Sequence, residues 1–146
     1  MTLKVEHTIT IAAPPERVWQ AWVKEINQWW VKPYYSDAEL ATGLLMEPKL
    51  GGHLIEQWGT DGEGFLVGVV IEWLPPRRLA YTWTERGAAG FSTLVEVELA
   101  AEGKGTRLTF THSGFEQYAD SQHQRDEHQG GWEDLIDHLK THVEKR

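Results

Sequence analysis

The chain contains the stretch Leu74-Pro75-Pro76-Arg77-Arg78-Leu79-Ala80-Tyr81-Thr82-Trp83, in which two prolines precede an alternating aromatic segment. Proline cannot donate a backbone hydrogen bond to a sheet, so the pair ends the strand before it. Leu79, Tyr81 and Trp83 occupy every second position, so they share one face of the following strand. The stretch therefore predicts a turn between two strands and an aromatic face directed into the protein.

Further strands are predicted on both sides of this stretch. Residues 65–74 are apolar on both faces, and residues 61–64, Asp-Gly-Glu-Gly, have the chemistry of a hairpin turn. Residues 39–45 and 51–58 are expected to form two more strands before residue 65. Beyond residue 83, two alternating segments turn apolar side chains and one histidine inward: Val95, Val97 and Leu99, then Leu108, Phe110 and His112.

The two ends of the chain have different patterns. Residues 3–11 alternate as a strand, and Pro14-Pro15-Glu16 then opens a helix, since proline is tolerated in the first turn. An apolar stripe at helical spacing follows on one or two short helices: Val18, Trp22, Ile26 and Trp29. A final helix, expected to begin between Ser121 and His128, has one apolar face: Trp132, Leu135, Ile136, Leu139 and Val143, with His128 one turn upstream.

These elements predict an α+β fold in a single domain spanning residues 1–146. An antiparallel sheet of about six to seven strands must cover its concave face, and the amphipathic C-terminal helix is the element that can do so. Gly52, Gly59 and Gly68 are expected to let the strands bend around that helix. The predicted architecture is a curved sheet wrapped around a long C-terminal helix, with two short helices after the first strand.

The composition narrows the classes of function. The 146 residues include no cysteine, which excludes thiol nucleophiles, disulfides and thiolate metal sites. A net charge of −8 argues against nucleic-acid binding, because phosphates need a basic surface. No phosphate-binding loop is present, His138 and His142 are expected to face solvent rather than share a metal, and no apolar run could span a bilayer. We therefore expect a cytoplasmic protein without a cofactor, metal, nucleic-acid or membrane partner.

Four motifs in a fixed order resemble the START-like (SRPBCC) superfamily. They are Ala-Pro-Pro-Glu-Arg-Val-Trp at 13–19, the proline–aromatic stretch at 75–83, Gly-Thr-Arg-Leu through His-Ser-Gly-Phe at 105–115, and Gly-Trp at 131–132. Within the superfamily, the chain is most similar to the group named after the C-terminal domain of the activator of the 90-kDa heat-shock chaperone ATPase. The resemblance implies a helix-grip fold with a cavity between sheet and long helix, where related proteins hold lipids, sterols, polyketides or plant aromatics. The eukaryotic activator also carries an N-terminal domain not found here, so we do not expect a chaperone partner.

Eight residues on inward faces are the candidate ligand contacts: Trp30, Trp58, Tyr81, Trp83, His112, Phe115, Trp132 and Ile136. For each residue taken alone, an ordinary place in the core is the alternative interpretation. The chain has eight tryptophans, however, and a core seldom needs so many indoles when leucine would fill the same space. The excess favours an aromatic-lined cavity.

His112 and Glu56 are the candidate catalytic residues. His112 shares an apolar strand face, where it would act as an acid–base group, anchor a ligand, or simply be a core histidine with its hydrogen bonds satisfied. Glu56 faces inward if it shares a face with Leu54 and Trp58, and burial would then make it a proton acceptor. In the opposite register, Ile55 is inside and Glu56 lies in water.

Three functions follow from these observations. The first is a carrier or sensor that binds a small hydrophobic ligand, aromatic or lipid-like, in the internal cavity. The second is an enzyme of the same fold, a cyclase or hydrolase of polyketide-like compounds, and the third is an interaction module that acts on a chaperone. Paired polar groups inside the pocket would favour the enzyme, and a large exposed apolar patch would favour the module. The sequence leaves open whether a reaction is catalysed and whether the chain forms a homodimer.

Overall fold

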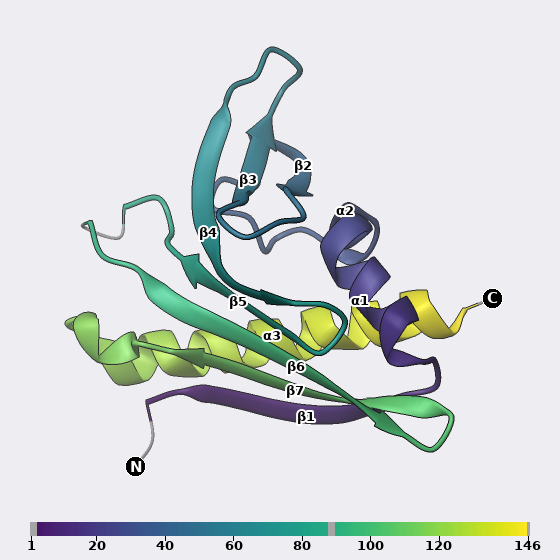
Figure 1. Ribbon diagram of the computed structural model, residues 1–146. Helices are drawn as coiled ribbons and strands as arrows, with labels where there is room; N and C mark the ends of the chain where they lie inside the picture. The colour runs from purple at the N-terminus through teal and green to yellow at the C-terminus, as the bar shows by residue number, and fades with distance from the viewer. Residues whose placement is uncertain (1–2, 88–89, 146) are drawn as a thin grey trace.

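Seven antiparallel strands form one curved sheet in the order β1-β7-β6-β5-β4-β3-β2 (Figure 1). The computed structural model describes residues 3–87 and 90–145, and residues 1–2, 88–89 and 146 of the predicted domain lie outside the described residues. The strands are β1 Val5–Ile11, β2 Ala41–Met46, β3 His53–Trp58, β4 Gly64–Leu74, β5 Arg78–Trp83, β6 Thr93–Glu102 and β7 Gly105–Ser113. The helices are α1 Pro15–Lys24, α2 Ile26–Trp29, the 3-10 turn η1 Phe115–Gln117 and α3 Ser121–Glu144. The predicted α+β class and element order are confirmed.

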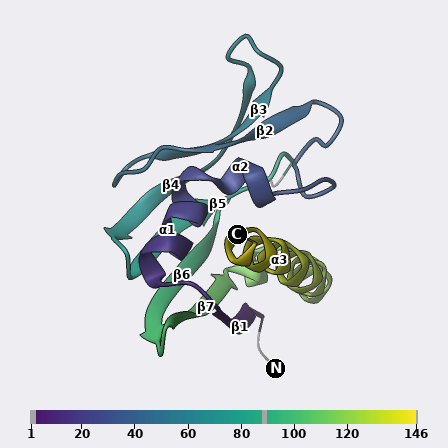
Figure 2. The ribbon, with the colours of Figure 1, turned by 90° about the vertical axis from the view of Figure 1, so that its right-hand side faces the viewer.

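Helix α3 lies in the concave face of the sheet, and Figure 2 shows the strands curving around it. A row of buried side chains in register crosses this face from β1 to β4: Val5, His112, Val95, Tyr81 and Val70. The helix buries its predicted apolar face against the sheet: Trp132, Leu135, Ile136, Leu139 and Val143. Each such side chain contributes on the order of 1.5–3 kcal/mol when fully buried. The prediction that this helix fills the sheet and begins between Ser121 and His128 is confirmed.

The two short helices close one end of the curved sheet. Helix α1 begins at Pro15, where the missing N–H costs no hydrogen bond, and an acidic residue in its first turn suits the positive helix end. The predicted apolar stripe is buried throughout: Val18, Trp22, Ile26 and Trp29. Trp22 and Trp29 meet edge to face with their ring centroids 5.2 Å apart, which fixes α2 against α1.

Of the three glycines expected to bend strands, only Gly68 lies within one. A shift in the register of β3 and β4 occurs beside it. A Cβ at Gly68 would lie 1.7 Å from the carbonyl oxygen of Thr82, so only glycine permits this approach of two strands. Gly52 and Gly59 lie just outside β3, so the prediction that they bend a strand is wrong.

The outer face of β2, β3 and β4 carries an exposed apolar row. Leu45 pairs with Ile55, and Ile55 pairs with Leu66, in adjacent strands. Leu45 and Leu66 are 46% and 47% exposed, so about half of each side chain is in contact with water. Among the described helices, none combines the length and apolar character needed to cross a membrane.

Candidate ligand pocket

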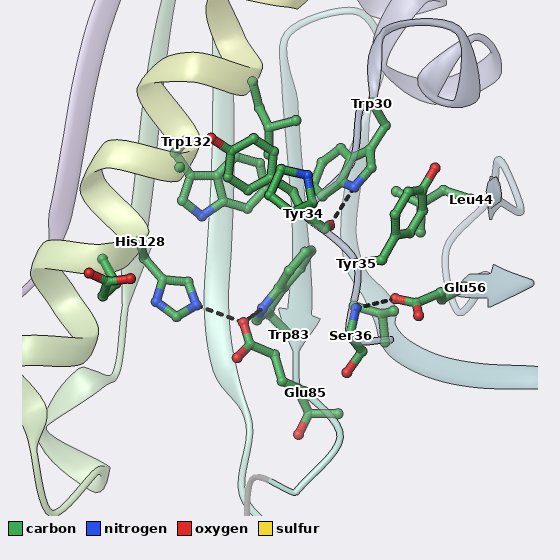
Figure 3. A pocket seen from close by; sticks show the side chains of 16 residues that line it. Trp30, Tyr34, Tyr35, Ser36, Leu44, Glu56, Trp83, Glu85, His128 and Trp132 are labelled. Carbon is green, nitrogen blue, oxygen red and sulfur yellow. Dashed lines mark hydrogen bonds and ion pairs between the residues drawn. The ribbon is translucent and has the colours of Figure 1, made fainter. Parts of the chain in front are cut away.

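A pocket of about 310 Å³ opens between α3, the middle of the sheet and the segment that follows α2 (Figure 3). Its lining residues come from six separate parts of the chain. They are Trp30, Pro33, Tyr34, Tyr35, Ser36, Leu44, Glu56, Val67, Trp83, Thr84, Glu85, Glu127, His128, Gly131, Trp132 and Leu135. No single segment of the sequence could build this pocket, because each wall belongs to a different element.

Three tryptophans form one wall of the pocket. Trp30 follows α2, Trp83 ends β5 and Trp132 lies on α3. Their ring centroids are 5.3 Å apart for Trp83 and Trp132, 5.5 Å for Trp30 and Trp132, and 6.0 Å for Trp30 and Trp83. Each indole N–H donates a hydrogen bond within the protein. The ring surface left for a ligand is therefore apolar.

Glu85 and His128 form a hydrogen-bonded pair beside this wall (Figure 3). Nε2 of His128 lies 2.6 Å from Oε2 of Glu85, and the indole N–H of Trp83 donates to the same oxygen at 3.0 Å. Nδ1 of His128 lies 2.7 Å from the carbonyl oxygen of Gln124. A carbonyl only accepts, so Nδ1 carries a hydrogen and Nε2 is left to share a proton with Glu85.

The environment of the pair favours its charged form. Burial disfavours the Glu85 carboxylate, but the hydrogen bond and charge of His128 outweigh burial and lower the pKa of Glu85. Burial likewise disfavours the His128 imidazolium, but the hydrogen bond from its ring to Glu85 and the charge of that carboxylate raise the pKa of His128. The side chains of His128 and Glu85 are 14% and 33% exposed, so water screens the pair only in part. A histidine–glutamate ion pair therefore lines the pocket.

Glu56 faces inward, as the first of the two registers predicts, and is 1% exposed. Its carboxylate accepts hydrogen bonds from the backbone N–H groups of Ser36 and Asp37, at 2.6 and 2.9 Å, and from the indole of Trp58 at 2.9 Å. These bonds tie the segment after α2 to strand β3 and so shape the pocket. A role for Glu56 in proton transfer stays a prediction.

His112 lies behind the tryptophan wall and is fully buried. The indole N–H of Trp132 donates to its Nδ1 at 2.9 Å, so the ring hydrogen resides on Nε2, which lies 2.6 Å from Oγ1 of Thr93. Burial and then the nearby charge of His128 hold the pKa of His112 well below its ordinary value. A neutral His112 thus orients the Trp132 ring, and it does not line the pocket.

The structure divides the predicted ligand contacts into two groups. Trp30, Trp83 and Trp132 line the pocket. The other five lie elsewhere: Trp58, Tyr81, His112, Phe115 and Ile136. Tyr81, Phe115 and Ile136 are fully buried in the core, and the Trp58 ring packs under the guanidinium of Arg86 at 5.0 Å. Ligand contact by any of the eight residues stays a prediction.

The pairing of Glu85 with His128 was not predicted from the sequence. His128 was placed on the face of the final helix that carries Trp132, but Glu85 was not singled out. A signal for it exists, because Glu85 continues the every-second-residue pattern of Tyr81 and Trp83 beyond the end of β5. The aromatic residues Tyr34 and Tyr35, which also line the pocket, follow a proline and have no periodic signal.

Two histidines of α3 outside the pocket, His138 and His142, each lie near a carboxylate. Nε2 of His142 lies 2.8 Å from Oε1 of Glu25, so the prediction that His142 faces solvent is wrong. His138 is 45% exposed and lies 3.8 Å from Asp134. Across residues 3–87 and 90–145, no three histidine, aspartate or glutamate side chains are grouped as a metal ion would require.

Solved structures share this fold. Protein MLL2253 from Mesorhizobium loti is 21% identical over 94% of each chain, with a TM-score of 0.71. The Aha1 dimer from Colwellia psychrerythraea is 18% identical, covers 99% of this chain and 98% of its own, and has a TM-score of 0.68. DynU16, from the dynemicin biosynthetic locus, is 22% identical over 99% of this chain but only 48% of its own, with a TM-score of 0.74. Identities this low establish the fold alone.

A family model supplies the assignment that these structures do not. Comparison with curated proteins finds no match. The model of the activator of Hsp90 ATPase homolog 1-like protein, in contrast, matches residues 12–144, which include every helix and all strands after β1. The chain therefore belongs to the family of activator of Hsp90 ATPase homolog 1-like proteins, within the START-like superfamily.

Proposed function

We propose that the protein binds a small, flat, apolar molecule in this pocket, as a carrier or sensor. The observation that carries the proposal is the wall of three indoles, which converge from three elements on one hollow. Burying apolar surface against such a wall stabilises a complex by about 25 cal/mol per Å² before the costs of association. A flat aromatic molecule presents the largest area for its volume to these rings.

The size of the pocket narrows the class of ligand. Its volume of about 310 Å³ lies at the lower end of the range for small-molecule sites, roughly 300–1,000 Å³. This volume favours a compact aromatic molecule over a long acyl chain or a sterol. The family resemblance allows this class, because plant aromatics are among the ligands that related proteins hold between the sheet and the long helix, beside lipids, sterols and polyketides.

Two adjacent glycines of α3 provide a test with its own control. A Cβ at Gly131 would lie 3.3 Å from the Tyr34 ring in the pocket, whereas a Cβ at Gly130 meets nothing within 4 Å. Leucine improves helix propensity equally at both positions. We expect Gly131→Leu to weaken binding of an aromatic ligand by about tenfold or more, because the leucine fills the pocket. Gly130→Leu should bind as the unmodified protein does.

Titration calorimetry with compact aromatics, larger flavonoid-like compounds and fatty acids measures the affinities directly. Mass spectrometry of the purified protein would identify any ligand that stays bound. Equal affinities for the two leucine variants would place the binding site outside this pocket. Stronger binding of fatty acids than of every aromatic would overturn the assigned ligand class.

The Glu85–His128 pair favours a second candidate function, an enzyme of the same fold. Glu85 keeps one free carboxylate oxygen and shares a proton with an imidazole 2.6 Å away, an arrangement in which this carboxylate can act as a general acid or base. If a polyketide-like compound is turned over, His128→Gln should lower kcat by about 100-fold or more while the compound still binds. Turnover that survives this substitution would exclude the pair as the catalytic groups.

The exposed apolar row of Leu45, Ile55 and Leu66 favours self-association as the state in which the protein functions. A protein of the same fold from Colwellia psychrerythraea is described as a dimer. In an isologous dimer this face would pack against the same face of a second copy. Apolar side chains would then meet apolar side chains and leave water. Sedimentation of Leu66→Asp as a monomer and of the unmodified chain as a dimer would support the proposal. A monomeric unmodified chain at micromolar concentration would end it.

A further inference from the structure

The polar side of the pocket has an unused hydrogen-bond acceptor. Oε2 of Glu85 receives the hydrogen bonds of both Trp83 and His128. Among the described residues, no donor contacts the other oxygen, Oε1. A carboxylate oxygen accepts up to two hydrogen bonds, so Oε1 keeps its full capacity. Glu85 lines the pocket, so its carboxylate keeps one free anionic oxygen at the edge of the apolar wall.

The position of this oxygen is held from two sides. The Trp83 indole fixes the carboxylate to the end of β5, and His128 fixes it to α3, 43 residues away along the chain. His128 is fixed in turn by the Gln124 carbonyl at 2.7 Å. Because the carboxylate is already fixed before a ligand binds, little side-chain conformational entropy is lost on binding.

The two other carboxylates of the lining do not offer an equivalent site, because Glu127 is exposed to water and Glu56 is fully engaged. Both oxygens of Glu56 already accept hydrogen bonds from the protein. The pocket lining contains the carboxylates of Glu56, Glu85 and Glu127 but no lysine or arginine. The one basic side chain, His128, is already paired with Glu85. A ligand carboxylate would find no free cation and would meet Glu85.

We propose that Glu85 selects neutral aromatic ligands that carry a hydroxyl group, which donates to Oε1, and that aromatic carboxylates are rejected. This inference rests on the proposed function of the pocket. A hydrogen bond to a charged group changes affinity by about 10-fold to 100-fold. A hydroxyl is thus expected to improve binding by that factor over its methyl ether.

Three probes of the same ring system test the selection: 2-naphthol, 2-methoxynaphthalene and 2-naphthoate. By titration calorimetry near neutral pH, 2-naphthol should bind the unmodified protein about 10-fold to 100-fold more tightly than its methyl ether. The naphthoate should bind most weakly. The indole N–H resonance of Trp83, which donates to the same carboxylate, should shift more with 2-naphthol than with the ether.

Glu85→Gln removes the charge but keeps the shape, and it should abolish the advantage of 2-naphthol. Glu25→Gln is the matched control, since Glu25 also pairs with a histidine of α3, at 2.8 Å, and lies outside the pocket. Urea midpoints and near-ultraviolet circular dichroism establish that both variants fold. The probe series with unmodified protein decides the question even if Glu85→Gln is unstable.

The outcomes separate this inference from the proposal on which it rests. Equal affinity for 2-naphthol and 2-methoxynaphthalene would overturn donor selection and leave the apolar pocket intact. Tighter binding of the naphthoate would overturn it as well. Binding of none of the three probes would reject the proposed function, and donor selection with it. Loss of the 2-naphthol advantage in Glu25→Gln would show that the effect does not come from the pocket.

Discussion

Thr93→Val tests the hydrogen bonds that satisfy the two ring nitrogens of the buried, neutral His112. Nδ1 accepts from the Trp132 indole at 2.9 Å, so the ring hydrogen must point at Oγ1 of Thr93, 2.6 Å from Nε2. The Thr93 hydroxyl donates in turn to the Trp83 carbonyl at 3.2 Å. Valine keeps the branched shape of threonine and removes only the hydroxyl.

The cost of this substitution follows from the burial of the site. Thr93 is 6% exposed and His112 is fully buried, so water cannot replace the missing hydroxyl. Moving the ring hydrogen to Nδ1 would bring it against the Trp132 N–H, so one polar hydrogen is orphaned in either tautomer. A buried unsatisfied donor costs about 1–3 kcal/mol. For a chain of this size each kcal/mol lowers Tm by about 2–4 °C.

Urea unfolding of the unmodified protein and of Thr93→Val measures the difference in the free energy of unfolding. Thr111→Val is the matched control, because Thr111 lies in the neighbouring strand β7 on the opposite face of the sheet. The control should change stability by no more than about 0.5 kcal/mol. A Thr93→Val protein as stable as the control would refute the assigned hydrogen-bond chain and the tautomer of His112.

Three further substitutions have expected outcomes. Gly68→Ala should lower the free energy of unfolding by about 1–3 kcal/mol, because its Cβ would lie 1.7 Å from the Thr82 carbonyl oxygen; an unchanged Tm contradicts the close approach. Glu56→Gln should lower the free energy of unfolding in urea by about 1–3 kcal/mol, because the NH₂ group of glutamine would face at least one of the three N–H groups that Glu56 now accepts from. An unchanged free energy of unfolding would show that these hydrogen bonds do not stabilise the fold. The stabilisation from the raised pKa of His128 is complete below its unfolded value of about 6.5 and is lost as pH rises through its folded pKa. His128→Gln should therefore destabilise the protein more at about pH 6 than at about pH 9, and an equal gap would show that the ion pair is not the cause.

The periodicity of the sequence was sufficient to predict most of the fold. Alternation along a strand reports which side chains share a face, and it placed Tyr81 and His112 inside, whereas it left both registers of Glu56 open. The apolar stripe of α3 likewise predicted its buried residues and the face that carries His128. Periodicity failed at Gly52 and Gly59, because a glycine at a strand end and one within a strand have the same local signal.

The sequence could not show which inward-facing residues lie in the core and which line the pocket. Tyr81 and Trp83 share one face of one strand, yet Tyr81 is in the core and Trp83 lines the pocket. The two-residue alternation of a strand gives the face on which a side chain lies. It does not tell which element packs against that side chain. That depends on where α3 and the segment after α2 lie over the curved sheet.

What the sequence determined by itself is the set of elements and the face that each one buries, because these properties repeat every two residues or every 3.6 residues along the chain. What only the tertiary structure decided is which polar groups meet. Glu85 and His128 are 43 residues apart, and His142 meets Glu25 across 117 residues. Such pairs depend on how distant segments are brought together. The physical reason is that a hydrogen bond requires two atoms within about 3 Å, a condition that no local pattern of residues encodes.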